Sequence, residues 1–308
     1  MIRAFDGEEF SSSFVCIGNF DGVHLAHREL ILNTVRQAKG EKLTSIVYTF
    51  CPSPKEIFGA EVKKITSEED KTKLIEKLGA DVYYSQRCSM EFLRKSPEEF
   101  ARDVLKIKLG AKKVFVGYDF TFGRDGKGTA KELSVLGEKY GFDVSVLPEI
   151  KIGGKAVKST AVREYIKEGK IEQANEMLER AHSYSGRVFR AKMLGRTIGF
   201  PTANIYPEEG LILPPFGVYA SKVLLEGDLY PGVSNIGINP TVENGEKPKI
   251  ETNIMGFSGD IYGKNIKIYL YKMIRREKTF SGIDALSSQI KKDADEAKKI
   301  IDKTNDIW

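Results

Sequence analysis

The feature that most constrains the fold is a change in sequence pattern near residue 182. Before it, short apolar segments alternate with segments of helical spacing, whereas after it strand-like segments follow one another with few helical intervals. The alternating pattern predicts β-α-β units and a mostly parallel sheet. The second pattern, punctuated by glycine and proline, predicts an antiparallel barrel or sandwich. We therefore expect two domains, 1–181 and 182–308, each long enough to bury its own core.

The individual elements follow from these patterns. In the first part, strands are expected at 14–17, 43–50, 81–85, 113–116 and 142–147, with helices at 28–40, 67–78, 97–109 and 129–141, and two short helices over 164–181. In the second part, strands are expected at 186–191, 217–225, 230–236, 250–255 and 266–274. A closing amphipathic helix places on one face Ile283, Leu286, Ile290, Ala294, Ala297 and Ile301.

The segment GNFDGVHLAH, residues 18–27, joins the first strand to the first helix. A helix N-terminus at this turn offers free backbone N–H groups to an anion, and Gly18 and Gly22 allow a ligand to approach the backbone closely. His24 and His27, two of the three histidines in the chain, lie on one face of the first helical turn. Such imidazoles can donate hydrogen bonds to the charge of a transferring phosphoryl group.

The histidine pair has two other possible interpretations. The pair could be an ordinary solvated helix cap. It could also be half of a zinc site, but zinc takes three or four ligands, and the chain adds only His182 and no paired cysteines. Phosphate handling is therefore favoured over metal binding.

Three further loops of the first domain are expected at the same edge of the sheet, where ligands of parallel sheets bind. They are residues 49–54, residues 117–128 and residues 158–163. In the last of these, Ser159 and Thr160 are good N-caps. Arg163 lies one turn further, so hydroxyl groups, N–H groups and a guanidinium could converge on phosphate.

Composition sets broad limits on function. The net charge of +5 suits phosphorylated substrates but is too small to indicate nucleic-acid binding. Cys16, Cys51 and Cys88 show no pairing pattern, and the sequence contains neither a signal peptide nor a long apolar run. These features predict a cytoplasmic protein that does not bind membranes.

The most distinctive segment of the second domain is LGRTIGFPTAN, residues 194–204. Thr202 and Asn204 present a hydroxyl and an amide on the same side of an extended segment. Such oxygens suit a hard cation such as Mg²⁺, which binds through few protein ligands and through phosphates. An ordinary turn followed by a strand is the alternative interpretation.

Together these segments resemble the bacterial bifunctional riboflavin kinase/FMN adenylyltransferase family, also called FAD synthetases. Residues 18–27 resemble the GxFDGxHxGH motif of nucleotidyltransferases, with Ala26 in place of glycine. Residues 49–54, 117–128 and 159–163 resemble the family's TFxPxP, GxDFxFGxxxxG and STxxR segments, with Cys51 and Ser53 as departures. Residues 201–204 match the PTAN signature of riboflavin kinases, and the match continues at 232–241, 251–252, 259–263 and 274–280.

The resemblance implies a Rossmann-like nucleotidyltransferase domain with a parallel sheet, followed by a small antiparallel β-barrel of the riboflavin kinase type with a closing helix. It implies phosphorylation of riboflavin to FMN and adenylation of FMN to FAD, with ATP as co-substrate, ADP and pyrophosphate as products, and no nucleic-acid or membrane partner. The implied catalytic residues are Glu251 as the base of the kinase and His24 and His27 for adenylation. The implied ATP and phosphate contacts are Gly18, Phe20, Asp21, Gly22, Ser159, Thr160, Arg163, Gly195, Arg196 and Thr197. The implied flavin contacts are Asp119, Phe120, Arg124, Arg275 and Phe280, and the implied Mg²⁺ ligands are Thr202 and Asn204.

Two alternatives remain open at this point. The first domain could adenylate or cytidylate another small phosphorylated substrate. The chain could also be a ligand-binding domain joined to an RNA-binding barrel, although the barrel segment lacks closely spaced aromatic residues among its cations, which disfavours stacking on bases.

Overall fold

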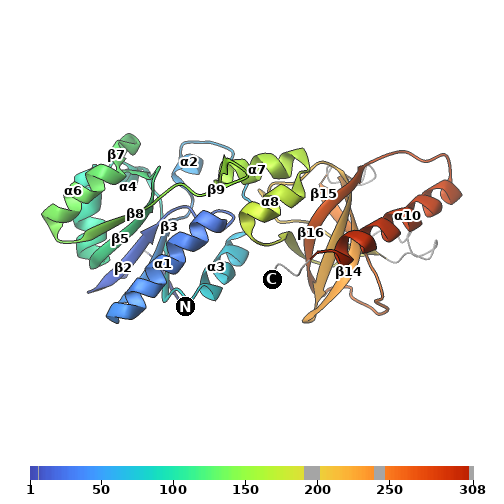
Figure 1. The fold of residues 1–308 in the computed structure, drawn as a ribbon, viewed down its shortest axis with the longest axis horizontal. Helices are drawn as coiled ribbons and strands as arrows, with labels where there is room; N and C mark the ends of the chain where they lie inside the picture. The colour runs from blue at the N-terminus through green and yellow to red at the C-terminus, as the bar shows by residue number, and fades with distance from the viewer. Residues whose placement is uncertain (6, 191–201, 239–246, 305–308) are drawn as a thin grey trace. The chain divides into compact units, whose positions relative to one another are not determined.

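The computed structural model describes residues 1–5, 7–190, 202–238 and 247–304, and the chain divides into two compact units, Met1–Ser159 and Thr160–Trp308 (Figure 1). This division lies before the predicted domain boundary at residue 181, because the intervening helices belong to the second unit. They are α7 (Ser159–Glu168) and α8 (Ile171–Leu178). From α8, the Asn175 amide donates to the Leu270 carbonyl at 2.9 Å. A functional boundary at 181 remains a prediction.

The first unit is built on a parallel sheet with the strand order β1-β4-β3-β2-β5-β8. Its strands are β1 (Ile2–Ala4), β2 (Ser13–Ile17), β3 (Thr44–Phe50), β4 (Val82–Gln86), β5 (Ala111–Gly117) and β8 (Asp143–Leu147). The predicted parallel sheet is confirmed. The chain also contains short elements, which are α2 (Pro54–Ile57), α4 (Met90–Leu93), β6 (Thr121–Phe122), η2 (Arg124–Gly126), β7 (Gly128–Thr129), β9 (Lys151–Ile152) and β10 (Lys155–Ala156).

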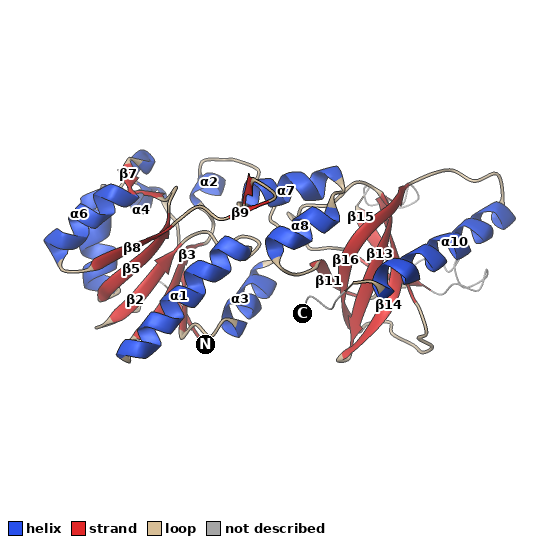
Figure 2. Cartoon of the chain, viewed as in Figure 1, coloured by secondary structure: helices blue, strands red, loops and turns tan. Residues whose placement is uncertain are grey.

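Helices cover both faces of this sheet (Figure 2). On one face lie α1 (Leu25–Glu41) and α3 (Glu68–Lys77), and on the other lie α6 (Ala130–Tyr140) and the segment 97–108. Residues 14–17 of β2 are all apolar because alternate residues of this strand pack into the two opposite cores. The turn that follows β2 therefore begins at the end of an inner strand that is buried on both faces of the sheet.

The helix predicted at 97–109 begins as expected. Ser96 caps it together with Glu99 and Pro97 stands in its first turn, so α5 spans Pro97–Glu99. It then continues as a π-helix, η1 (Phe100–Lys108), which the sequence did not predict. Gly110 ends it at φ 57°, where an added Cβ would lie 2.3 Å from the Phe10 carbonyl oxygen. Glycine is required there because the two backbones meet.

The second unit contains an antiparallel sheet with the order β11-β16-β13-β14-β15-β12. Its strands are β11 (His182–Arg187), β12 (Thr202–Ile205), β13 (Gly217–Leu225), β14 (Asp228–Ile238), β15 (Pro248–Ile254) and β16 (Asn265–Arg276). The Phe189 N–H donates to the Asn204 carbonyl at 2.9 Å, linking the two edges of the sheet. The predicted barrel is confirmed, although its first strand begins at 182 rather than 186.

Helix α10 (Ile283–Asp302) packs on this sheet through Ala297 and Ile301, against Ala220 and Tyr271. The predicted apolar face is only partly correct. Ile283 is exposed, and the third buried residue of the helix is Asp293. The reason is an ion pair with β16, described below.

Candidate functional site

The turn between β2 and α1 brings the two predicted histidines together. His24 is the N-cap of α1, and its Nδ1 accepts from the His27 N–H at 3.3 Å. The two rings stack with centroids 3.6 Å apart and an interplanar angle of 15°. Because Nδ1 accepts, the neutral His24 ring carries its proton on Nε2. The structure therefore places both imidazoles together at the first turn of α1, with the His27 N–H capped by the His24 ring.

The backbone of this turn is strained. Phe20 has φ 50° and Val23 has φ 39°, a region that is unfavourable for residues other than glycine and especially for a β-branched one. Both side chains are buried, with 0% and 1% of their surface exposed. Strain of this kind is typical of ligand-binding sites, where the surrounding packing enforces it. The Phe20 ring thus supports the turn from within the core, against Gly18.

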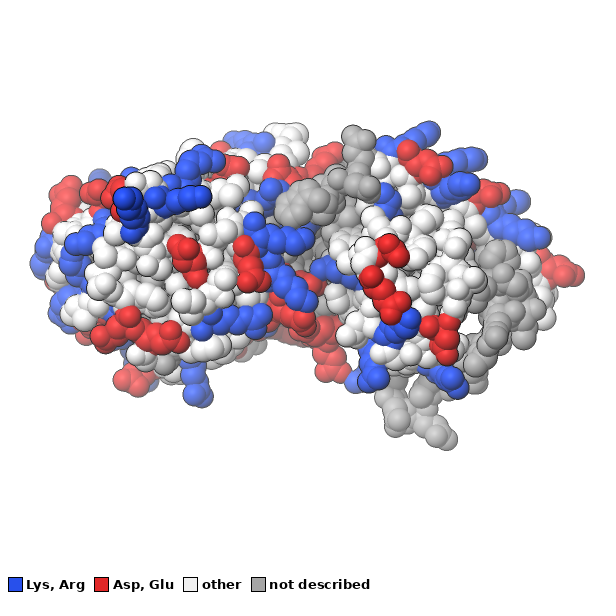
Figure 3. All heavy atoms as spheres, turned by 90° about the horizontal axis from the view of Figure 1, so that it is seen from below, with Lys and Arg blue, Asp and Glu red and all other residues white. Residues whose placement is uncertain are grey.

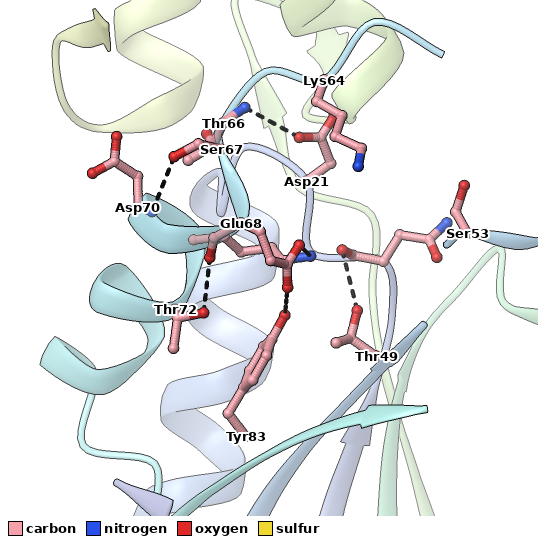
Figure 4. Close-up of polar contacts among 12 residues, drawn as sticks. Asp21, Thr49, Ser53, Lys64, Thr66, Ser67, Glu68, Asp70, Thr72 and Tyr83 are labelled. Atoms are coloured by element: carbon pink, nitrogen blue, oxygen red, sulfur yellow. Dashed lines mark hydrogen bonds and ion pairs between the residues drawn. The ribbon is translucent and has the colours of Figure 1, made fainter. Parts of the chain in front are cut away.

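Asp21 ties the turn to a distant loop. Its carboxylate accepts from the Ile65 N–H at 3.0 and 3.1 Å and from the Thr66 N–H at 3.3 Å (Figure 4). Ile65 also packs over Gly22, whose added Cβ would lie 3.0 Å from its Cδ1. The Ser159 hydroxyl donates to the Asp21 carbonyl at 2.9 Å. The structure therefore places Ser159 at the turn, as predicted.

The loop that Asp21 holds continues into α3, which is fixed by a partly buried network (Figure 4). Tyr83 of β4 donates to the Glu68 carboxylate, which also pairs with Lys71 at 2.7 Å. Burial, reinforced by Glu68, raises the pKa of Tyr83 far above its usual range, so the phenol remains a donor. Both ends of the loop are therefore anchored, one on the sheet and one on the turn.

Two of the loops predicted at this edge, residues 49–54 and 117–128, lie at the ends of β3 and β5. Phe120 stacks on Phe122 with centroids 5.6 Å apart. Half-buried Phe50, in the predicted loop 49–54, lies 6.1 Å between ring centroids from half-buried Phe92, which the sequence analysis missed. These rings offer flat apolar faces.

Two predicted flavin contacts of the first unit are engaged by other groups. Asp119 pairs with Lys158 at 2.8 Å and holds the pKa of that amine above its usual range. Arg124 donates from Nε to the Arg94 carbonyl at 2.9 Å, at the end of α4. Thr160 and Arg163 belong to the second unit, so their roles in the first site remain predictions.

In the second unit, the predicted base and the predicted metal ligands share one sheet face. Asn204 of β12 pairs directly with Glu251 of β15. The Thr202 hydroxyl donates to Glu251 Oε1 at 2.8 Å. Lys249, which the sequence analysis missed, lies 3.2 Å from Glu251 Oε2 and 3.4 Å from Asn204 Oδ1. Its signal in the sequence was a second charge two residues before Glu251, which places both side chains on one face of a strand.

Gly195, Arg196 and Thr197 lie outside the described residues. Arg275 binds the Asp293 carboxylate of α10 through Nε and Nη2 at 2.8–3.1 Å. Its guanidinium also lies 5.6 Å from the Phe280 ring centroid. The structure thus brings the two predicted flavin contacts together, but it uses Arg275 to hold α10. Asp293 is only 3% exposed. Its ion pair with Arg275 explains why a charged residue lies on the packing face of α10.

The donor types at this sheet face can be compared with those a metal requires. Within the described ranges, no group of three or more His, Cys, Asp or Glu side chains could hold a metal ion. Thr202 and Asn204 instead offer neutral oxygens next to one carboxylate, a set that fits a hard cation carried by a nucleotide. Over the same part of the chain, none of the helices has the length and apolar character needed to cross a membrane.

Comparisons with known proteins match both units of the chain. The FAD synthetase family model matches residues 7–161, and the riboflavin kinase model matches residues 178–301. The bifunctional riboflavin kinase/FMN adenylyltransferase of Bacillus subtilis is 40% identical over 94% of this chain and 93% of its own length. The protein of the same name from Escherichia coli is 36% identical over 90% of this chain and 89% of its own length.

A solved structure from Streptococcus pneumoniae, described as a macrolide-efflux protein, has the same architecture. It is 28% identical, has a TM-score of 0.87, and the match covers 97% of this chain and 99% of that one. The family models account for both units, and the relatives match over nearly the whole length. The chain therefore belongs to the family of bifunctional riboflavin kinases/FMN adenylyltransferases, enzymes that carry both activities in one polypeptide.

Proposed function

We propose that this chain phosphorylates riboflavin on the β12–β15 face and adenylates the resulting FMN at the turn between β2 and α1. The observation that carries the proposal is the side-chain cluster of Thr202, Asn204 and Glu251, in which a carboxylate lies 2.8 Å from a hydroxyl oxygen beside an amide oxygen. It provides a proton acceptor next to oxygens that suit a metal-bound phosphate.

In the kinase step, the ribityl 5′-hydroxyl of riboflavin attacks the γ-phosphorus of ATP, and ADP leaves. Glu251 accepts the hydroxyl proton during the attack. Thr202 and Asn204 would hold Mg²⁺, which neutralises the phosphate charge when bound. Arg275 and Phe280 are proposed flavin contacts, together with the phosphate contacts Gly195, Arg196 and Thr197.

In the second step, a phosphate oxygen of FMN attacks the α-phosphorus of ATP, FAD forms and pyrophosphate leaves. The reaction needs no protein nucleophile, so the site has to position the substrates and stabilise charge. His24, His27 and the N-terminus of α1 supply donors at this point. Arg163 adds a cation, and Ser159 and Thr160 add hydroxyl groups. The flavin contacts are Asp119, Phe120 and Arg124, in the loop 117–128.

We place both reactions in the cytoplasm, with riboflavin, FMN, FAD, ATP, ADP and pyrophosphate as the partners. Cys16, Cys51 and Cys88 are free thiols, which suits a reducing compartment. Basic and acidic side chains are interspersed on the face drawn in Figure 3, which suits small charged substrates better than a nucleic-acid backbone.

The test is to incubate the protein with riboflavin, ATP and Mg²⁺ and to separate the flavins by chromatography. FMN should form first and FAD should follow. When FMN and ATP are supplied alone, FAD and pyrophosphate should still form. A folded protein that makes neither flavin would overturn the proposal, and one that makes FMN alone would overturn its second half.

A further inference from the structure

Lys249 is a charged residue of the second unit that the proposed reaction does not use. Along β15 the buried residues are Ile250, Thr252 and Ile254, so Lys249 and Glu251 share the opposite face. The Lys249 side chain is only 15% exposed and that of Glu251 is 29% exposed. The ion pair is therefore partly withdrawn from solvent, where charges interact more strongly than on an open surface.

The contacts of Lys249 extend a chain of four polar side chains, which runs from Thr202 through Glu251 and Lys249 to Asn204. Thr202 donates to Glu251 Oε1. The Lys249 ammonium lies 3.2 Å from Glu251 Oε2 and 3.4 Å from Asn204 Oδ1. Each carboxylate oxygen therefore has its own partner, and the amide oxygen of Asn204 is oriented by the same cation. Asn204 itself is 4% exposed, so this orientation is fixed by its surroundings.

This arrangement addresses a conflict at the proposed site. A carboxylate is a stronger ligand for a hard divalent cation than a hydroxyl or an amide. Because Glu251 lies on the same face as Thr202 and Asn204, a divalent cation bound there would attract its carboxylate. A carboxylate that coordinates a metal is a weaker proton acceptor, so the base would be lost. The Lys249 ammonium, which contacts the Glu251 carboxylate, opposes that outcome.

We propose that Lys249 is a positioning residue that reserves Glu251 for proton transfer by keeping its carboxylate off the metal. The proposal rests on the proposed roles of Glu251 as base and of Thr202 and Asn204 as metal ligands. Lys249 acts through Glu251 and takes no part in the chemical step. Loss of the ammonium should free the Glu251 carboxylate to bind the metal and should remove it from proton transfer. The affinity for the metal should therefore rise while the kinase turnover falls.

The test measures both effects in the full-length K249M variant. Its kcat for riboflavin phosphorylation should fall roughly 10- to 100-fold, the usual range for residues that position a ligand or base. Binding of Mn²⁺ without nucleotide, followed by electron paramagnetic resonance, should tighten about tenfold or more, because the Glu251 carboxylate becomes available as a ligand. K249R keeps the charge and should resemble the wild type in both measurements.

Three controls make the test decisive. K247M removes an exposed lysine of the same unit that pairs with Glu209, and it should change neither quantity. In the E251Q/K249M double variant, Mn²⁺ should bind no more tightly than in E251Q. Unchanged kcat or unchanged Mn²⁺ affinity in K249M would overturn the proposal, as would K249R binding Mn²⁺ as tightly as K249M. If E251Q itself keeps full kinase activity, the proposed base is wrong, which is a separate failure.

Discussion

The two units build their candidate sites from different parts of the chain. In the first unit, the site is a backbone turn in which Phe20 and Val23 occupy strained conformations and the helix start provides N–H groups. In the second unit, the site consists of side chains on neighbouring strands of regular geometry, such as Asn204 opposite Glu251. One site depends on how the backbone is held, and the other on which side chains alternate onto one face.

This difference determines which substitutions should impair each site. A strained turn persists only while its surroundings enforce it, so residues that hold the turn through hydrogen bonds, such as Asp21, should affect it. A strand face tolerates changes in its neighbours but depends on the identity of each functional group. Substitutions in the two units should therefore differ in both size and kind.

The largest expected effect is that of E251Q. The amide keeps the size of the side chain but removes the proton acceptor, so kinase turnover should fall roughly 10²- to 10⁴-fold. Adenylation of added FMN should continue at the wild-type rate, because the proposed adenylation site does not include Glu251. Initial rates of the two half-reactions, measured separately by chromatography, test this. A parallel loss of both activities would contradict the separation of the sites.

H27A should give the next largest effect, in the opposite unit. It removes a proposed donor to the transferring phosphoryl group together with the ring that stacks on His24. FAD formation should fall roughly 10²- to 10³-fold, by comparison with loss of an oxyanion donor. Riboflavin should still be converted to FMN, which serves as the internal control for folding. Normal FAD synthesis by H27A would remove the histidine pair from the mechanism.

The third histidine, His182, should make the stability of the second unit sensitive to acid. His182 is buried and donates to or accepts from Tyr184 Oη at 2.8 Å, and burial lowers its pKa to about 3 from 6.5. Above pH 6.5 both the folded and the unfolded states are neutral at this site. As pH falls from 6.5 towards 3, the unfolded state binds a proton that the folded state refuses, so stability falls by up to about 1.4 kcal/mol per pH unit.

H182Q, which does not titrate, should show a shallower acid dependence than the wild type. The free energy of unfolding of the second unit can be followed by urea titration with hydrogen-exchange mass spectrometry of peptides from β11 and β16. Identical pH dependence in the two proteins would show that His182 does not carry the effect.

The smallest expected effect is that of D21N. The amide keeps one acceptor for Ile65 and Thr66 but loses the negative charge, which weakens the hold on the loop. Adenylation should fall about tenfold, while kinase activity should not change. Hydrogen exchange at the Ile65 and Thr66 amides should accelerate. Slower FAD synthesis without faster exchange would assign Asp21 to direct phosphate contact, the role expected from the sequence.

Local signals in the sequence predicted much of this structure. The capping of the helix at Ser96, the continuous apolar strand 14–17 and the histidine turn depend on residues a few positions apart, and the structure confirms them. Propensity, capping and periodicity act over such distances. The barrel was likewise predicted from local signals, because each strand-like segment after residue 182 can be recognised from its own residues.

Features that join distant residues could not be predicted. The contact of Asp21 with Ile65 spans 44 residues, and that of Asn204 with Lys249 spans 45. Nothing in either local pattern states which strand lies beside which. The same holds for Arg275: the family resemblance implies a flavin contact there, whereas its partner Asp293 is revealed only by how α10 packs.

The pair formed by Arg275 and Asp293 also limits how this protein can evolve. Loss of either partner would leave a charge in a nearly buried site, at a cost of about 3–5 kcal/mol, a large part of the stability of an ordinary domain. A single substitution would therefore be removed by selection before a compensating change could arise. The two positions should be inherited as a unit, so that relatives either keep both charges or have replaced both.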